Sequence, residues 1–245
     1  MKLLVCISQV PDTTTKITFT PDKKAFNAQG VQFIINPNDE IALTRALELK
    51  ESLGGTVSVI NVGQPNTEPN LRKALAIGAD DAIRVNAEPT DAYFVAFQIA
   101  EVIKKNTYDV ILAGKESIDY NGGQVPEMIA EFLGIPSVSV ATKLDISGTT
   151  ATLEREIDGG KEVVETKLPF VAGAQKGMSE PRIPNMRGIM TARSKPLVVV
   201  EPAACDLLSR SETFDLPPVK GECKMIDPNN VAELVNLLHT EAKAI

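Results

Sequence analysis

The amino-acid sequence predicts an α/β protein built on a doubly wound parallel sheet. Short apolar runs of strand length alternate with amphipathic segments of helix length, at a spacing of roughly 25–30 residues per strand–helix unit. The first run, Leu3–Ser8 (LLVCIS), is apolar at nearly every position, as expected of a central parallel strand that is buried on both faces. A glycine-rich polar segment, Gly114–Pro126, joins one later strand to a helix, and parallel sheets of this kind bind ligands at such junctions.

The other strands are predicted from apolar runs bounded by glycine or turn residues. They are Thr56–Val62, Asp81–Val85, Val110–Ala113, Ser137–Val140, Phe170–Ala174 and Leu197–Val200. Helices are predicted over Asn36–Leu53, Asn70–Ile77, Asp91–Asn106 and Glu127–Leu133. The first of these helices begins with polar cap candidates and ends at Gly54-Gly55. Alternating residues at 16–20 and a return through Val31–Ile35 predict a β excursion between the first strand and the first helix.

The pattern changes after Thr142. Thr150–Glu156 and Glu162–Leu168 alternate and predict a hairpin around Ile157–Lys161. The segment 174–187 reads as an exposed loop, followed by a helical turn at Ile189–Ala192. We therefore predict one α/β domain over residues 1–200, including the hairpin 150–168 and a loop 174–190. Residues 201–245 form an irregular tether and a final helix, Asn229–Ala244, with one apolar face. An arm that packs on another chain is favoured over packing on its own domain.

Composition excludes several classes of function. A net charge of −7 argues against a nucleic-acid or anionic-membrane binder, and no apolar run is long enough to span a bilayer. The three cysteines are unclustered and the N-terminus does not resemble a signal peptide, so we expect a cytoplasmic protein. The single histidine, His239, lies in the final helical segment, where a surface residue is the ordinary interpretation. No metal-ligand, hydrolase or Walker motif is present.

The loops at the carboxyl ends of the predicted strands are polar and rich in glycine. They are Gln9–Asp12, Asn36–Asp39, Gly63–Asn66 and Gly114–Gln124. Such loops form the ligand cleft of Rossmann-like, adenine-nucleotide-binding sheets, although the GxGxxG fingerprint is missing. The turn at Gly114–Pro126 could cradle a phosphate with its backbone N–H groups and the following helix, or it could be an ordinary surface loop.

Five sequence motifs together carry a resemblance to a known family. They are NPNDEIAL at 36–43, ALAIGAD at 74–80, GKESIDYNGGQ at 114–124, EREIDGG at 154–160 with KLP at 167–169, and EPR at 180–182. In this order and spacing they resemble the beta subunit of electron-transfer flavoprotein over nearly the whole chain. The C-terminal arm is similar in length and character but has no obvious motif.

The resemblance implies a heterodimer in which an alpha subunit holds most of the redox FAD. This chain would then be an electron-carrier subunit and not an enzyme by itself. The complex would accept electrons from acyl-CoA and related dehydrogenases, as in fatty acid oxidation, and pass them to a membrane-bound electron-transfer flavoprotein quinone oxidoreductase. This subunit would hold AMP as a structural nucleotide or, in the electron-bifurcating branch, a second FAD.

The family's nucleotide contacts fall on the strand-end loops described above. Carried over by position, they are Cys6, Asn36, Pro37, Asn38, Asp39, Val62, Gly114, Lys115, Glu116, Ser117, Ile118, Asp119, Tyr120, Asn121, Gly122, Gly123, Gln124 and Val125. The N–H groups of Gly122, Gly123 and Gln124 are expected to face the phosphate. Asn36 and Asp39 could bind the nucleotide or cap the helix, because one side chain rarely does both.

Two departures from the family bear on which nucleotide binds. The AMP branch often has an acidic loop rich in Asn, Gln and Thr where this chain has Tyr120–Val125, so phosphate recognition would shift toward backbone amides. The bifurcating branch usually has Gly-Asp-Thr-Ala where this chain has Tyr120–Gly123. AMP is therefore favoured over FAD. A stand-alone ATP-hydrolysing or ATP-sensing domain is disfavoured because an SGGxDS-type loop is absent.

Two further regions correspond to partner contacts in the family. Glu156 takes the position of a glutamate that meets an arginine of the alpha subunit when the flavin domain swings; from the residues alone it would be a solvated hairpin charge. The segment that includes Glu180, Pro181 and Arg182 takes the position of the loop that docks onto dehydrogenases. Met186 occupies the place of its apolar anchor, with an ordinary exposed methionine as the alternative.

Overall fold

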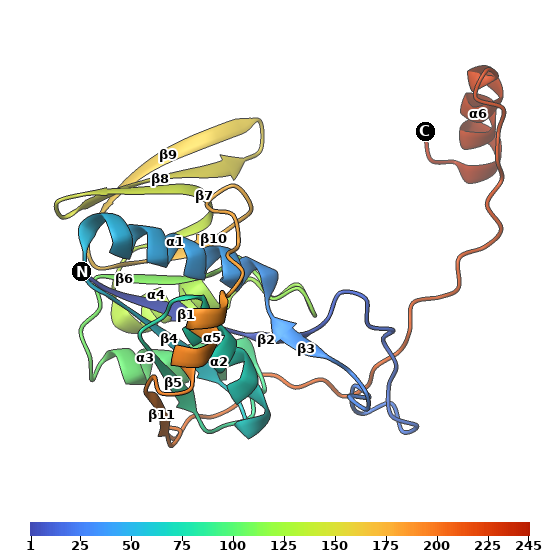
Figure 1. The fold of residues 1–245 in the computed structure, drawn as a ribbon. Helices are drawn as coiled ribbons and strands as arrows, with labels where there is room; N and C mark the ends of the chain where they lie inside the picture. Colours follow the sequence, from blue (N-terminus) through green and yellow to red (C-terminus); the bar gives the residue numbers. More distant parts are fainter. The chain divides into compact units, whose positions relative to one another are not determined.

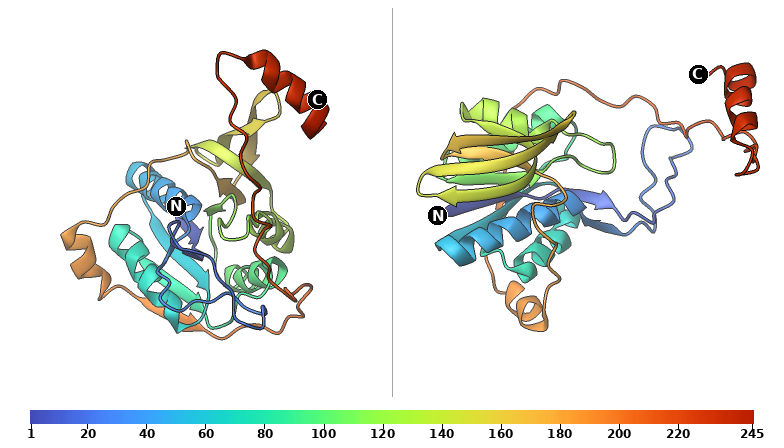
Figure 2. Two further views of the ribbon diagram at one scale, coloured as in Figure 1. Left: turned by 90° about the vertical axis from the view of Figure 1, so that its right-hand side faces the viewer. Right: turned by 90° about the horizontal axis from the view of Figure 1, so that it is seen from above.

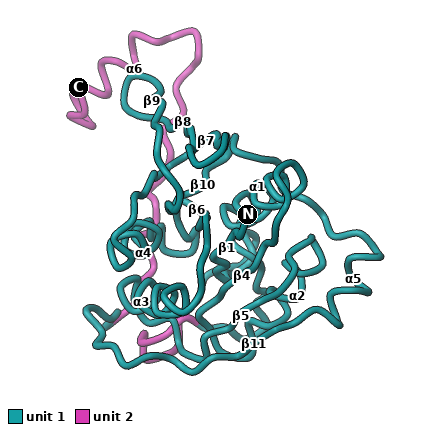
Figure 3. Tube along the Cα trace, turned by 90° about the vertical axis from the view of Figure 1, so that its left-hand side faces the viewer, with its two compact units in different colours: residues 1–17, 27–212 teal, residues 18–26, 213–245 magenta.

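The computed structural model describes residues 1–245, which divide into two compact units (Figure 3). Unit 1 comprises Met1–Ile17 and Asn27–Glu212, and unit 2 comprises Thr18–Phe26 and Thr213–Ile245. All of the predicted nucleotide and partner residues belong to unit 1. No helix in either unit combines the length and the apolar character that crossing a bilayer would require.

A nine-stranded sheet forms the centre of unit 1 (Figure 1). Its strands are β1 (Lys2–Cys6), β4 (Thr56–Val62), β5 (Asp81–Val85), β6 (Val110–Gly114), β7 (Ser137–Ser147), β8 (Thr150–Ile157), β9 (Gly160–Lys167), β10 (Phe170–Ala174) and β11 (Leu197–Val200). Their spatial order is β11-β5-β4-β1-β6-β10-β7-β8-β9. Strands β11 through β7 in this order are parallel, whereas β8 and β9 extend the sheet as an antiparallel hairpin.

Helices cover both faces of the sheet (Figure 2). They are α1 (Pro37–Leu53), the short 3-10 helix η1 (Pro65–Thr67), α2 (Glu68–Ile77), α3 (Ala92–Ile103), α4 (Val125–Leu133) and α5 (Met186–Ala192). Helices α1 and α2 bury Leu43 and Leu75 in one apolar cluster together with Val5 of β1. Helices α3 and α4 bury Ile99 and other residues in a second cluster together with Leu4. Because neighbouring residues of β1 face opposite clusters, the whole strand is apolar, and the predicted doubly wound fold is confirmed.

The predicted elements differ from the observed ones mainly where the chain leaves the parallel sheet. Strand β7 continues beyond Val140 to Ser147, and its outer part pairs with β8. The predicted β excursion forms only the short antiparallel pair β2 (Gln9–Pro11) and β3 (Phe33–Ile35). The helical turn predicted at Ile189–Ala192 begins earlier, at Met186, with Asn185 as its N-cap.

Unit 2 combines a small turn with the C-terminal helix. The turn is closed by a bridge between Phe19 and Phe26, and the ring of Phe19 stacks on that of Phe214 with centroids 5.3 Å apart. Helix α6 (Val231–Leu237) continues into a π-helical turn, Leu238–Ala242, so the final helix is confirmed with shorter bounds. None of the residues of α6 is buried, and its apolar face is exposed at Leu234.

Candidate functional site

The candidate site lies where the chain order of the parallel sheet reverses. From β1 the chain builds outward through β4 and β5, and then crosses back to place β6 on the other side of β1. The carboxyl ends of β1 and β6 are therefore neighbours whose following loops leave in opposite directions. Open α/β sheets bind their ligands outside the strand ends at this switch point. The segments Asn36–Asp39 and Gly114–Val125 meet here, as predicted.

Asp39 ties the two strand ends together. Its Oδ2 accepts hydrogen bonds from the backbone N–H and the hydroxyl of Ser8, at 2.7 and 2.5 Å, just beyond β1. Its Oδ1 accepts one from the backbone N–H of Gly114, the last residue of β6, at 2.8 Å. The carboxyl group is buried, and this burial raises its pKa to about 6 against the lowering effect of its hydrogen bonds. Asp39 thus acts as a brace whose oxygens are already occupied by the protein.

Asn36 and Asn38 attach the start of α1 to the glycine-rich loop. Both side-chain amides donate to the backbone carbonyl of Glu116, at 2.8 Å from Asn36 and 3.2 Å from Asn38. Asn36 occupies the N-cap position of α1 without forming a side-chain cap, and Asp39 is likewise directed elsewhere. Of the two roles weighed for these side chains, capping α1 is therefore not the one they perform. The side-chain Oδ1 of Asn36 is buried and accepts no hydrogen bond.

The end of β6 lies so close to the start of α1 that position 114 must be a glycine. A Cβ atom at Gly114 would lie 2.5 Å from Oδ1 of Asp39 and 2.6 Å from Cβ of Asn38. Only a residue without a side chain lets β6 end against the brace while its N–H donates to Asp39. The first glycine of the GKESIDYNGGQ motif therefore has a packing role.

The glycine-rich loop after β6 keeps a row of backbone donors free. The loop closes on itself through the N–H of Ser117, which donates to the carbonyl of Gly122 at 3.0 Å. The N–H groups of Gly123 and Gln124 donate to no protein group, whereas Gly122, which was expected to face the phosphate as well, is paired with Ser117 in an antiparallel bridge; α4 begins directly afterwards at Val125. Free N–H groups at the positive end of a helix are suited to bind an anion. This arrangement fits the phosphate of a nucleotide recognised by backbone amides.

The charges around the loop are mixed. Lys115 forms an ion pair with Glu116 at 3.3 Å. Glu127 lies in the first turn of α4, where its half-burial raises the pKa of the carboxyl group, with Arg155 acting in the opposite direction.

Burial also raises the pKa of the Cys6 thiol at the end of β1, and the charge of Asp39 adds to this effect. Cys6 is therefore a packing residue at the end of β1, without the thiolate character that thiol chemistry needs.

Residues that the sequence did not single out support the neighbouring strand end. Asn61 of β4 donates its amide to the carbonyl of Ile7 at 2.8 Å, beside the predicted contact residue Val62. The guanidinium of buried Arg84 donates to the carbonyl of Gly63 at 2.9 Å and pairs with Glu68 at 3.1 Å. The available signal was an arginine within the apolar strand Asp81–Val85. Ser8, the partner of Asp39, lay within the predicted first strand without a role.

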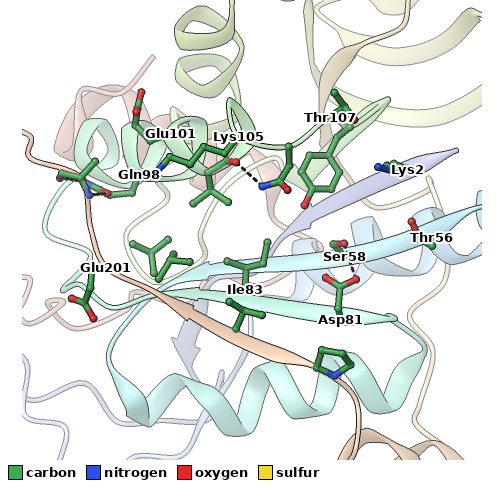
Figure 4. Close-up of a pocket in the computed structure, with 18 residues that line it drawn as sticks. Lys2, Thr56, Ser58, Asp81, Ile83, Gln98, Glu101, Lys105, Thr107 and Glu201 are labelled. Atoms are coloured by element: carbon green, nitrogen blue, oxygen red, sulfur yellow. Dashed lines mark hydrogen bonds between the residues drawn. The ribbon is translucent and has the colours of Figure 1, made fainter.

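A groove of about 580 Å³ lies away from the predicted residues (Figure 4). It is walled by α3 and by the amino-terminal starts of strands, at Lys2, Thr56 and Asp81. Ser58 and Asp81, joined by a 3.1 Å hydrogen bond, form part of its lining. Since none of the predicted nucleotide residues lines this groove, it is separate from the switch point.

The predicted partner residues lie on two segments, the end of β8 and the loop that leads into α5. Glu156 is exposed near the end of β8 and accepts a hydrogen bond from the side chain of Gln175 at 2.8 Å. Glu180 and Pro181 are also exposed, whereas Arg182 pairs with Glu51 of α1. Met186, the first residue of α5, leaves 74% of its surface exposed. These positions are compatible with contact to another protein.

Comparison with known proteins agrees with this geometry. A family model described as the electron transfer flavoprotein domain matches residues 24–205. The electron transfer flavoprotein subunit beta of Bacillus subtilis is 40% identical over 100% of both chains, and that of Homo sapiens is 35% identical over 89% of each. The caffeyl-CoA reductase-Etf complex subunit CarD of Acetobacterium woodii is 33% identical over 99% of this chain and 98% of its own.

Proposed function

This chain belongs to the electron transfer flavoprotein family, and we propose that it is the beta subunit of a heterodimeric electron carrier. In this proposal the heterodimer accepts electrons from acyl-CoA and related dehydrogenases and delivers them to a membrane quinone oxidoreductase. The beta subunit turns over no substrate by itself. Its role is to hold a nucleotide, to assemble with the alpha subunit that holds FAD, and to present a surface to electron donors.

The observation that carries the nucleotide part of the proposal is the junction built on Asp39. The brace closes the switch point between β1 and β6, while the N–H groups of Gly123 and Gln124 remain free. AMP would place its phosphate against these amides and against the start of α4. Since no catalytic base or nucleophile is among these residues, a nucleotide here would stabilise the subunit rather than react.

A second candidate is a flavoprotein subunit that holds FAD in the same cleft. This second candidate is retained because the relative named as a subunit of the caffeyl-CoA reductase-Etf complex matches nearly the whole chain. Recognition through backbone amides would serve the pyrophosphate of FAD as well as the phosphate of AMP. The two candidates differ in what the cleft holds, and not in the fold.

Assembly with the alpha subunit is proposed to use the C-terminal arm. Helix α6 presents Val231, Leu234 and Val235 with 62%, 42% and 42% of their surfaces exposed. An amphipathic helix whose apolar face is not buried within its own chain is suited to pack on another protein. We propose that Glu156 adds a contact to an arginine of the alpha subunit.

Nucleotide analysis of the purified heterodimer tests the proposal. Acid releases the bound nucleotides, and mass spectrometry identifies and counts them. One FAD and one AMP per heterodimer is the expected result. Two FAD would overturn the AMP assignment in favour of the second candidate. Purification of this chain without an alpha subunit, combined with ATP turnover by the chain alone, would overturn the carrier function itself.

A further inference from the structure

Helix α5 exposes apolar side chains on its outer side and packs closely against α2 on its inner side. Ile183, Met186 and Met190 leave 90%, 74% and 72% of their surfaces exposed along α5 and the loop before it. On the inner side, a Cβ atom at Gly188 would lie 2.2 Å from the carbonyl oxygen of Ala76, so the backbones of α5 and α2 approach closely (Figure 1). The apolar surface therefore rests on a rigid neighbour.

The two helices cap each other's carboxyl ends. Arg72 of α2 donates to the backbone carbonyls of Ala192 and Lys195, at 2.9 and 2.7 Å, where α5 ends. Lys195 in turn donates to the carbonyls of Leu75 and Ala79, at 2.9 and 2.5 Å, where α2 ends. The last carbonyls of a helix lack partners within the helix and carry partial negative charge, which a cation satisfies. Arg72 of α2 thus caps the end of α5, and Lys195, three residues after α5, caps the end of α2.

The loop before α5 is fastened to α1. Ser179 donates its hydroxyl to Glu48 at 2.8 Å, and the backbone N–H of Arg182 donates to the hydroxyl of Thr44 at 3.2 Å. The guanidinium of Arg182 forms two parallel hydrogen bonds with the carboxylate of Glu51, at 2.5 and 2.8 Å. Bidentate pairs of this kind hold orientation as well as charge. The segment is therefore held on both sides of its exposed residues.

We infer that Arg72 and Lys195 are positioning residues that hold α5 as a preformed docking surface for the electron-donating dehydrogenase. The inference rests on the proposed function, in which the chain presents a surface to dehydrogenases, and on the family resemblance, which puts that surface on this loop. Residues 181–200 contain no acidic side chain, and two of their four basic ones, Arg187 and Arg193, have no partner within the chain, although the chain carries a net charge of −7. This composition suits an apolar pocket rimmed by carboxylates on the partner. A surface held in its bound conformation loses less entropy when the partner docks, so the caps should act on affinity.

The test uses the intact heterodimer with Arg72→Met and Lys195→Met. Each substitution removes a capping cation but keeps most of the apolar stem. Lys73→Met is the matched control, since Lys73 is the next residue of α2 and pairs with Glu40 at 2.6 Å instead of capping α5. Reduction of the heterodimer by an acyl-CoA dehydrogenase gives KM and kcat. Reduction by dithionite, bound flavin content and the thermal midpoint report on effects that do not involve docking.

We expect Arg72→Met and Lys195→Met to raise KM for the heterodimer about tenfold, which corresponds to about 1.4 kcal/mol of binding free energy. The value of kcat, dithionite reduction and flavin content should stay near those of the wild type, and Arg72→Lys should recover part of the loss. Equal KM values for Arg72→Met and Lys73→Met would overturn the inference. A loss of flavin or of folding in both capping variants would also overturn it, because the caps would then serve stability alone.

Met186→Ala, measured in parallel, separates this inference from the proposed function. If Met186→Ala raises KM while the capping variants do not, the docking surface stands and the positioning role fails. If Met186→Ala and the capping variants all leave KM unchanged, the assignment of this loop to the dehydrogenase fails together with the inference.

Discussion

Replacing Ser8 by alanine tests whether the buried carboxylate of Asp39 braces the switch point. The substitution removes the hydroxyl that donates to Oδ2 of Asp39 at 2.5 Å and leaves the backbone N–H of Ser8 in place. A hydrogen bond to a charged group contributes about 1.5–3 kcal/mol. Because Ser8 is only half-buried and water can replace its hydroxyl, the lower end, about 1.5 kcal/mol, is expected.

The sign of the pH dependence follows from the raised pKa of Asp39. In the folded protein this pKa is about 6, above the 3.8 of an unperturbed aspartate, so the proton binds more tightly to the folded state. The stability gained from protonation is complete below pH 3.8 and is lost as the pH rises through 6. Ser8→Ala raises the folded pKa by about one further unit. The variant should therefore lose about 1.5 kcal/mol above pH 8, and close to nothing by this route at pH 5.

Urea denaturation of the purified protein at pH 8 and pH 5 measures this difference as a change in the free energy of unfolding. Thr67→Val is the matched control, because its buried hydroxyl donates to the carbonyl of Gln64, which does not titrate. The control should lose the same free energy at both pH values. If the loss for Ser8→Ala is also the same at both pH values, Asp39 does not titrate as a buried brace and the reasoning fails.

Two further predictions concern the site and its partners. Gly114→Ala places a methyl group 2.5 Å from Asp39 and should lower the free energy of unfolding by about 1–3 kcal/mol. Gly173→Ala is the control: its methyl group would have its nearest contact at 3.4 Å, so the variant should be close to neutral. Equal thermal midpoints for the two variants would contradict this prediction. Glu156→Ala should slow electron transfer from the dehydrogenase by about two- to fivefold with normal assembly, since an exposed ion pair contributes up to about 1 kcal/mol. Stopped-flow reduction and gel filtration measure both effects, and failure to form the heterodimer would instead indicate a structural role.

Much of the parallel sheet could be predicted because a strand buried on both faces must be apolar throughout. The runs Thr56–Val62 and Phe170–Ala174 therefore match β4 and β10 residue for residue; Leu197–Val200 also matches β11, although that strand lies at the edge of the sheet with Val198 and Val199 exposed. Strand β7 was predicted to end at Val140, where the backbone takes a left-handed conformation and the pairing with β10 is irregular. From Thr142 onward the strand pairs only with β8 and is partly exposed, so no apolar run marks it.

The side-chain contacts were less predictable than the strands. The strand-end loops were correctly brought together, because parallel strands place their carboxyl ends at one edge. Asp39 was expected as a ligand or a cap, yet its partners Ser8 and Gly114 lie 31 and 75 residues away in the chain. Arg72 and Lys195 cap helices 120 residues apart in sequence. A basic residue on a helix looks the same in the sequence whether its side chain faces solvent or caps a distant carbonyl. Only the fold distinguishes these two roles.

Helix α1 gives a physical reason why the proposed nucleotide would matter without itself carrying electrons. Its first turn holds the switch point through Asn36, Asn38 and Asp39, and its last two turns hold the loop before α5 through Glu48 and Glu51. The 17 residues of α1 span about 25 Å, so one rigid element joins the cleft to the proposed docking surface. A nucleotide that orders the switch-point loops at the start of α1 would restrict the motion of α1. The docking loop, which is fastened to the last turns of the same helix, would be restricted with it. Removing the proposed nucleotide should therefore weaken docking as well as stability, although in the proposed function it would lie outside the path of the electrons.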